Sequence, residues 1–287
     1  MKIERRKPLT AKIGIVGVGH HTYWTQFEGL FDEMHRKLAV FDAKVKANGV
    51  ETVCFGLLDN AETAYAALPA MKAADLDLLF VDMVTYATSS TFGVIVRELN
   101  VPIVLVALQP LRAMPYATAM TYTQLCNDDF CSVPEFTGVA IRMGRPVADV
   151  VLGMREGDPI ADAALARWCQ IAKVLHDLRR ARIGLMGHVL ESMYDMHVDP
   201  TAVTAAFGCH IALCEPDEIL KHYLTDNPPA VEAMKRRILD FFDTPDPVSD
   251  PITTKLTERD LDVAARAAVA LEAFIAERKL DGLAYYY

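Results

Sequence analysis

Short apolar runs alternate with segments of helical spacing through the first part of the chain. The spacing predicts helices near residues 27–47, 92–99 and 159–180, while unbroken apolar runs of strand length predict buried strands. Because strands that alternate with helices are joined by right-handed crossovers, the pattern predicts a parallel sheet. The predicted strands lie at residues 12–19, 51–58, 76–84, 102–108 and 147–152.

The second part of the chain repeats this alternation. Strands are predicted at residues 182–187, 210–214 and 282–287, with helices from Pro200, Pro216, Pro228 and Thr257 and a proline-punctuated loop at 243–251. The sequence therefore predicts an α/β protein of two Rossmann-like, doubly wound parallel-sheet domains in tandem. We expect an N-terminal domain at residues 1–180 and a central α/β domain at residues 181–287. Since the chain stops inside a predicted strand, we expect the second domain to be incomplete at its C-terminus.

Composition and charge narrow the class of protein. The 287 residues are 52% apolar, enough to fill two cores, and the net charge is −9 with no cluster of Lys and Arg. Since phosphate binding needs a basic surface, we expect no nucleic-acid partner. No apolar stretch approaches the roughly 20 residues of a membrane span, and the run at 13–19 is short for a signal peptide. Six cysteines without a C-x-x-C pair indicate reduced thiols, so we expect a cytoplasmic protein.

Several polar residues have the spacing of helix caps. Asp59 with Glu62, and Ser132 with Glu135, match a capping box. Ser89 or Ser90 is predicted to cap the helix that follows the third strand. Asp199 stands before Pro200, which is the arrangement expected at a helix start, with the carboxylate as cap and proline in the first turn.

The segment after the first strand offers candidate chemistry. Gly17 and Gly19 match two positions of a dinucleotide fingerprint, and Asp59 ends the second strand where a ribose-binding acid would stand. Thr22, however, occupies the third glycine position. The run His20-His21-Thr22-Tyr23-Trp24 would crowd a pyrophosphate and suits a flat polar ligand such as a sugar. An aromatic plug at a domain boundary is the alternative interpretation.

Three further features follow other strands. Thr85 to Ser90 place hydroxyls and the Tyr86 ring after the third strand, in an arrangement suited to a polyol. Asp82 lies within that apolar strand and is either paired structurally or functional. Cys131 stands near a predicted helix start, where a thiol pKa can be lowered, and is a candidate reactive thiol.

The loop after the strand at 182–187 is rich in polar residues. In open parallel sheets ligands bind beyond the carboxyl ends of strands. Imidazole and carboxylate groups gather here within ten residues, as in a site for a hard metal ion. The spacing fits no strict metal motif, and exposed turn positions are the alternative for the last two residues of the set. The set is His188, Glu191, Asp195 and His197.

Five motifs together resemble the L-arabinose isomerase / L-fucose isomerase family over essentially the whole chain. They are GHHTYW at 19–24, VTYATSS at 84–90, LQP at 108–110, CSVPEFTGVAIRMG at 131–144 and RIGLMGHVLESMYDMHVDP at 182–200. The resemblance implies an N-terminal Rossmann-like domain, a second α/β domain and a further C-terminal domain. It also implies a divalent metal, usually Mn²⁺, whose glutamate and histidine ligands lie beyond the position of Tyr287. We therefore expect no catalytic residue and no metal ligand in this chain, and no activity from it alone.

The resemblance implies a free sugar as substrate, isomerised between aldose and ketose through an ene-diolate. It implies a homo-oligomer with active sites at subunit interfaces, in which His20 or His21 acts with Tyr23 at a neighbouring site. Cys131 replaces the histidine of the arabinose enzymes, which disfavours L-arabinose as substrate. The substrate-binding residues that the resemblance implies are His20, His21, Tyr23, Tyr86, Cys131, His188 and Leu190.

Two other functions stay open from the sequence. A sugar-binding protein without catalysis could also use two Rossmann-like domains around a cleft, although such proteins usually carry an export signal. A NAD-dependent oxidoreductase would use Gly17, Gly19 and Asp59.

Overall fold

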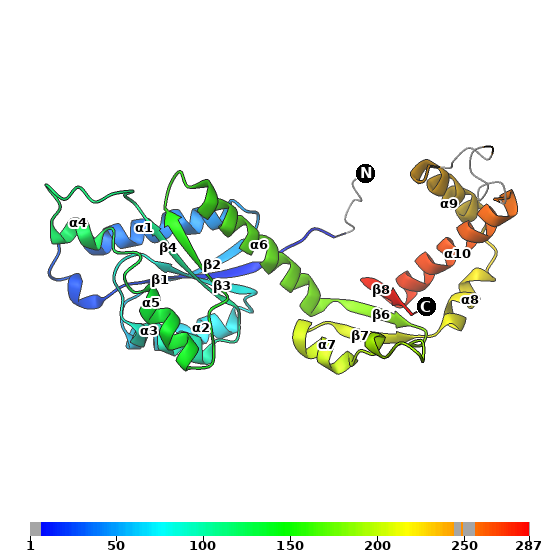
Figure 1. The fold of residues 1–287 in the computed structure, drawn as a ribbon, viewed down its shortest axis with the longest axis horizontal. Coiled ribbons are helices and arrows are strands. Elements are labelled where there is room, and N and C mark those ends of the chain that lie inside the picture. Colours follow the sequence, from blue (N-terminus) through cyan, green and yellow to red (C-terminus); the bar gives the residue numbers. More distant parts are fainter. Residues whose placement is uncertain (1–6, 244–247, 249–255, 287) are drawn as a thin grey trace. The chain divides into compact units, whose positions relative to one another are not determined.

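A computed structural model describes residues 7–243, 248 and 256–286. The chain divides into two compact units, Met1–Asp177 and Leu178–Tyr287. Each unit contains a parallel sheet whose strands alternate with helices (Figure 1). The predicted α/β class and the parallel pairing are therefore confirmed.

The first unit is built on a five-stranded sheet of order β2-β1-β3-β4-β5. All four neighbouring pairs are parallel. The strands are β1 (Lys12–Val18), β2 (Glu51–Leu58), β3 (Leu78–Met83), β4 (Ile103–Gln109) and β5 (Asp149–Met154). The helices are α1 (Leu30–Lys46), α2 (Ala61–Ala73), α3 (Ser89–Glu98), α4 (Thr121–Leu125), α5 (Val133–Arg142) and α6 (Pro159–Arg180), with a 3₁₀ turn at His21–Tyr23.

Helices cover both faces of this sheet, which explains the unbroken apolar runs of its strands. On one face α1 and α6 pack through residues such as Phe41 and Leu165. The other face is covered by α2, α3 and α5 (Figure 1). These helices contribute Leu68, Phe92 and Phe136, and the rings of Phe92 and Phe136 stack with centroids 4.8 Å apart. Every residue of β3 is buried. The sheet is therefore the centre of a three-layer unit.

The second unit has a three-stranded parallel sheet of order β7-β6-β8. Its core is small and centres on Met186, Cys214 and Phe274, while α9 and α10 pack together through Val231 and Ala265. The strands are β6 (Arg182–Met186), β7 (His210–Cys214) and β8 (Gly282–Tyr285). The helices are α7 (Pro200–Phe207), α8 (Pro216–Tyr223), α9 (Pro228–Phe241) and α10 (Glu258–Glu277), with a 3₁₀ turn at Tyr194–Met196.

One predicted helix cap is present in the structure and another is displaced. Asp199 accepts a hydrogen bond from the Thr201 N–H at 2.8 Å, so its predicted cap is confirmed. The predicted Asp59–Glu62 box is wrong by one residue, because Asn60 is the cap and accepts from the Thr63 N–H at 2.8 Å.

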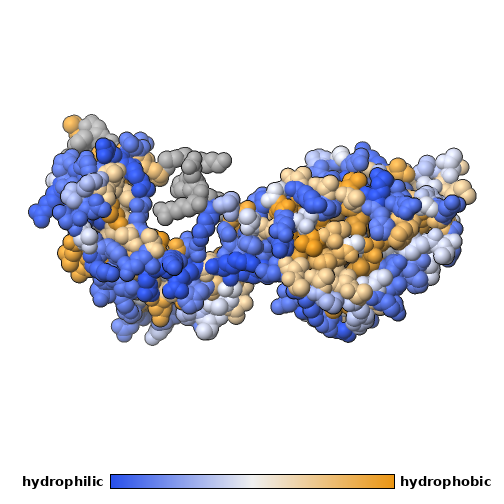
Figure 2. Space-filling model, turned by 180° about the vertical axis from the view of Figure 1, so that it is seen from behind, coloured by the Kyte–Doolittle hydropathy of each residue, from blue (hydrophilic) through white to orange (hydrophobic). Residues whose placement is uncertain are grey.

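Three further observations concern the proline-rich segment, the length of the helices and the surface. Most of the proline-rich segment at 243–251 lies outside the described residues. In the described part of the chain, none of the helices has both the length and the apolar character that a membrane span needs. Polar and apolar side chains are mixed over the surface of each unit, and an apolar patch is visible on the first (Figure 2).

Candidate functional site

Three of the predicted substrate residues meet at the carboxyl edge of the five-stranded sheet. β1 and β3 pair side by side and end together at Val18 and Met83. His20 and Tyr23 follow β1, and Tyr86 follows β3. The centroid of the His20 ring lies 5.3 Å from that of Tyr23 and 6.1 Å from that of Tyr86, and the two tyrosine rings are 6.1 Å apart. The contacts are edge-to-face, the arrangement that aromatic quadrupoles favour. We call His20, Tyr23 and Tyr86 the ring cluster.

The two adjacent histidines have different surroundings. The His20 ring contacts both tyrosines, whereas His21 is exposed and contacts the His20 ring at 5.2 Å. Burial lowers the pKa of His20, the nearby His21 lowers it further, and Asp59 opposes both effects. The His20 imidazole is therefore neutral at neutral pH and can both donate and accept a hydrogen bond. Its Nδ1 is shielded from solvent and has no hydrogen-bond partner among the described residues.

The same segment is poorly arranged for a dinucleotide. The Trp24 Nε1–H donates to Asp59 Oδ2 at 2.7 Å, so the expected ribose-binding acid is already engaged. A Cβ added to Gly19 would lie 2.9 Å from the Trp24 ring, which therefore covers the backbone that a pyrophosphate would approach. In addition, α1 begins only at Leu30, far from the end of β1. The geometry thus lacks the open strand-to-helix turn of the fingerprint.

Cys131 lies near the ring cluster together with an acid that the sequence did not single out. Its thiol hydrogen-bonds Asp128, and both groups act electrostatically on Tyr23. Burial raises the pKa of the Cys131 thiol, and the Asp128 carboxylate raises it further. A reactive thiol needs a lowered pKa, so burial and the neighbouring Asp128 carboxylate disfavour that hypothesis. In the sequence, Asp128 is marked only by its place beside Asp129 in the segment after a buried strand.

Hydrogen bonds join the loop after β3 to the loop after β4. The Thr85 hydroxyl donates to the Leu125 carbonyl at 2.7 Å. Ser132 Oγ accepts from the Ala87 N–H at 2.9 Å. Tyr86 is therefore held between two residues whose positions are fixed by the neighbouring loop.

These bonds also correct two predicted helix caps. Glu135 Oε1 accepts from the Ser89 N–H at 2.8 Å, so Glu135 and Ser132 both bond across to the other loop instead of to each other. The α3 cap position is Thr88, whose side chain makes no capping bond, so neither Ser89 nor Ser90 is the cap. The physical reason is that Glu135 already satisfies the exposed N–H of Ser89.

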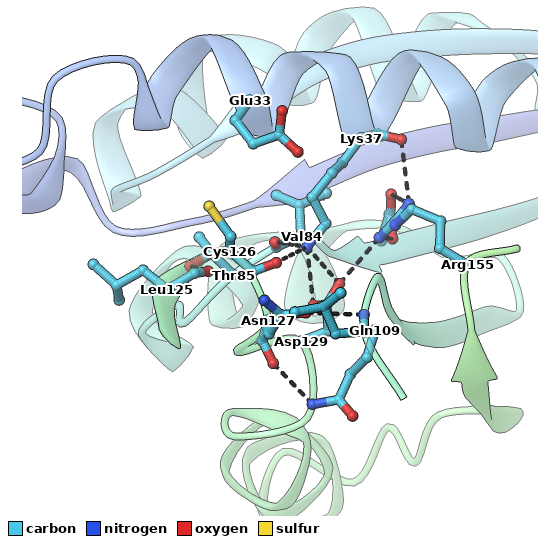
Figure 3. Close-up of polar contacts among 12 residues, drawn as sticks. Glu33, Lys37, Val84, Thr85, Gln109, Leu125, Cys126, Asn127, Asp129 and Arg155 are labelled. Carbon is cyan, nitrogen blue, oxygen red and sulfur yellow. Dashed lines mark hydrogen bonds and ion pairs between the residues drawn. The ribbon is translucent and has the colours of Figure 1, made fainter. Parts of the chain in front are cut away.

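A buried ion network lies beneath these loops (Figure 3). The Lys37 side chain, in the middle of α1, is fully buried and lies 2.8 Å from the Asp129 carboxylate. Its ammonium also donates to the carbonyl oxygens of Cys126, at 3.1 Å, and Val84. Three donor protons therefore meet three acceptors, as a buried ammonium requires.

Arg155 completes the network. Its guanidinium binds both carboxylate oxygens of Asp82, at 3.0 and 3.1 Å, and Asp129 at 3.1 Å. The open question about Asp82 is thereby answered, because it is a paired acid. Burial alone would lower the pKa of Arg155, but the two carboxylates raise it, and the group stays charged. Burial raises the pKa of Asp129 to about 6, against the opposing effect of Lys37 and Arg155.

The remaining predicted residues belong to the second unit. His188 and Leu190 lie on the exposed loop after β6, with His188 Nε2 3.6 Å from Glu215 Oε2. Among residues 7–243, 248 and 256–286, His, Cys, Asp and Glu side chains form no group of three or more able to hold a metal ion. The metal cluster considered for this loop is therefore wrong, and His197 instead packs against the Tyr194 ring at 5.7 Å.

Comparison with known proteins adds little. No protein-family model and no curated protein matches this chain. A solved structure from Vibrio cholerae O1 biovar eltor, described as a conserved domain protein, is similar over 96% of this chain and 89% of its own, with 13% identity and a TM-score of 0.25. A TM-score this low does not establish a shared fold.

Proposed function

We propose that this chain binds a free sugar at the ring cluster, as the sugar-enclosing part of a metal-dependent aldose–ketose isomerase of the arabinose/fucose isomerase family. The observation that carries the proposal is the meeting of His20, Tyr23 and Tyr86 where β1 and β3 end side by side. In the order β2-β1-β3-β4-β5 the chain proceeds in opposite directions from these two strands. Such a switch point is where Rossmann-like, doubly wound sheets bind ligands.

The chemistry of the cluster suits a polyol. The tyrosine rings offer apolar surface to the C–H groups of a sugar ring, and their hydroxyls, the neutral His20 and the Asp128 carboxylate offer donors and acceptors to its hydroxyls. The pKa of Tyr23 is raised by burial, by Tyr86 and by Asp128, so its hydroxyl keeps its proton for donation. The cluster therefore combines contact area with directional hydrogen bonding.

The proposed role of this chain is to bind and orient the sugar. Isomerisation moves a proton between the first two carbons, which requires a carboxylate and a cation that stabilises the developing negative charge. The resemblance places both beyond residue 287, and the residues described here form no metal centre. We expect homo-oligomers in which the loop of His20 serves a neighbouring site.

A panel of pentoses, hexoses and deoxyhexoses tests this function. Binding to the 287-residue chain is followed by saturation-transfer NMR, and Mn²⁺-dependent isomerisation is assayed with the protein from its complete reading frame. We expect at least one sugar to bind wild type and the Tyr65→Ala control, whose ring is exposed on α2, but not Tyr86→Ala. If no sugar binds, the site is wrong. If a sugar binds and no form isomerises it, only the isomerase part fails.

A further inference from the structure

The two loops that bracket the ring cluster share one anchor on α1. Lys37 donates to the carbonyl of Val84, where the loop that carries Tyr86 begins. It also donates to the carbonyl of Cys126 and to Asp129, in the loop that carries Asp128 and Cys131 (Figure 3). A single ammonium therefore fixes both loops to the same helix.

Lys37 lies on the apolar face of α1. Met34, Leu38 and Phe41 are its buried neighbours on the same helix. An apolar side chain at position 37 would avoid the desolvation cost of a buried charge, but it could not bind three acceptors from two loops. The lysine therefore serves to hold these acceptors, not to fill the core.

Asp129 is the acid that links the two cations of the network. It lies between Lys37 and Arg155, whereas Asp82 is held by both terminal guanidinium nitrogens of Arg155. With Asp129 charged, two cations face two carboxylates. Replacing Asp129 by a neutral residue would leave one buried positive charge without a partner, which favours opening of the loop to water. The charged or titratable groups that act on Asp129 are Lys37 from α1, Asp82 from β3, Arg155 after β5 and Cys126 from its own loop, while Glu33 acts on Lys37 and Arg155.

We propose that Lys37 and Asp129 are positioning residues of the sugar site, and that loss of their buried ion pair releases the segment carrying Asp128 and Cys131 from the loop that carries Tyr86. The effect on sugar affinity rests on the proposed function, whereas the release of the loop does not. Burial raises the pKa of Asp129 to about 6. Because a raised pKa means that the buried carboxyl binds its proton more tightly than a released one would, a falling pH does not release the loop, and the test is made by substitution at neutral pH.

The cysteines of the chain provide the measurement. Cys126 is half-buried within the network and reports release of the loop, while exposed Cys54 is the reference. Buried Cys169 reports global unfolding of the same unit. N-ethylmaleimide labelling is quantified at each site by tandem mass spectrometry. At about pH 7.5 we expect a low Cys126-to-Cys54 labelling ratio in wild type, because the closed loop shields Cys126, with Cys169 unlabelled.

Two variants separate charge from shape. Asp129→Asn removes the charge and keeps the size. Asp162→Asn makes the same change in a half-exposed carboxylate that pairs with Lys44, which lies on α1 like Lys37. In Asp129→Asn we expect the labelling ratio at about pH 7.5 to be about tenfold higher than in wild type, and sugar binding to be about tenfold weaker. The Asp162→Asn control should follow wild type in the labelling ratio and in sugar affinity.

Each outcome decides a separate point. A ratio in Asp129→Asn equal to that of wild type, or labelling of Cys169 in parallel with Cys126, overturns the proposal. If Asp129→Asn does not fold, the same labelling comparison with Lys37→Met decides. If no sugar binds even wild type, the proposed function fails, and the labelling ratio continues to test the positioning role.

Discussion

The two units follow the same alternation of strands and helices but bury their sheets to different extents. In the first unit β3 is buried throughout, and helices cover both faces of the sheet. In the second unit Leu213 of β7 is 69% exposed and Tyr285 of β8 is 67% exposed. Two apolar grooves open beside this smaller sheet, one of about 480 Å³ that includes Ile219 and one of about 380 Å³ that includes Val203.

This difference shows which part of the molecule can hold a site in a fixed geometry. A site is preorganised when its side chains stand on elements that packing and hydrogen bonds have already fixed. The ring cluster meets this condition, because buried bonds tie its loops to α1 and to each other. His188 and Leu190, on the exposed loop after β6, do not.

The largest expected effect compares the two cores directly. Phe80 is fully buried, and the centroid of its ring lies 5.8 Å from that of the Phe41 ring. Phe80→Ala should therefore lower the free energy of unfolding of the first unit by about 3–5 kcal/mol. Phe274→Ala should cost the second unit less, because a small core beside an open groove can relax into the cavity.

Urea unfolding separates the two cores by their probes. Both tryptophans, Trp24 and Trp168, belong to the first unit, so their fluorescence reports that unit alone, while circular dichroism reports both. An equal cost of the two substitutions would contradict the comparison.

The next effect compares two lysines that each contact carboxylates. Lys37→Met leaves buried Asp129 without one of its partners and should cost about 3 kcal/mol in tryptophan-monitored unfolding. Lys235 in the second unit contacts Glu258 and Asp262, whose side chains are exposed. Lys235→Met should leave the unfolding curve of the second unit, followed by circular dichroism, unchanged within error, since exposed pairs add little. A large effect at Lys235 would show that burial is not what distinguishes the two pairs.

A third prediction compares predicted sugar contacts in the two units. Tyr86→Ala removes a ring of the cluster and should weaken sugar binding about tenfold or more. Leu190→Ala changes a side chain that is 45% exposed and should have a smaller effect. Titration calorimetry with the best sugar of the panel gives both dissociation constants. Equal losses would show that the second unit contributes as much to the site as the first.

The strands and helices could be predicted because they follow from local pattern. Unbroken apolar runs belong to strands buried on both faces, and Asp199 before Pro200 predicts its helix start without any tertiary information. Local pattern gives the wrong prediction at Ser132 and Glu135. Their spacing is that of a capping box, but both side chains bond to a segment more than forty residues earlier in the chain.

The ion network could not be predicted because its partners are distant in sequence. Lys37 and Asp129 are 92 residues apart, and Arg155 and Asp82 are 73 apart. A lysine in an amphipathic helix is ordinarily a surface residue, so α1 alone gives no sign of the role of Lys37. Asp82 was recognisable as an acid inside an apolar strand, but its partner was not.

The smallest effect concerns two neighbours in the candidate site. Burial raises the pKa of the Cys131 thiol, and the Asp128 carboxylate raises it further. Asp128→Asn removes only the second cause, so the pKa should fall and the thiolate fraction at about pH 8 should increase. We expect Cys131 to react with N-ethylmaleimide about threefold faster, while Cys54 is unchanged. Buried Cys169 in the same unit should stay unlabelled, which confirms that the variant is folded. An unchanged Cys131 rate would mean that Asp128 does not set the pKa of this thiol, and that its carboxylate acts on Tyr23 instead.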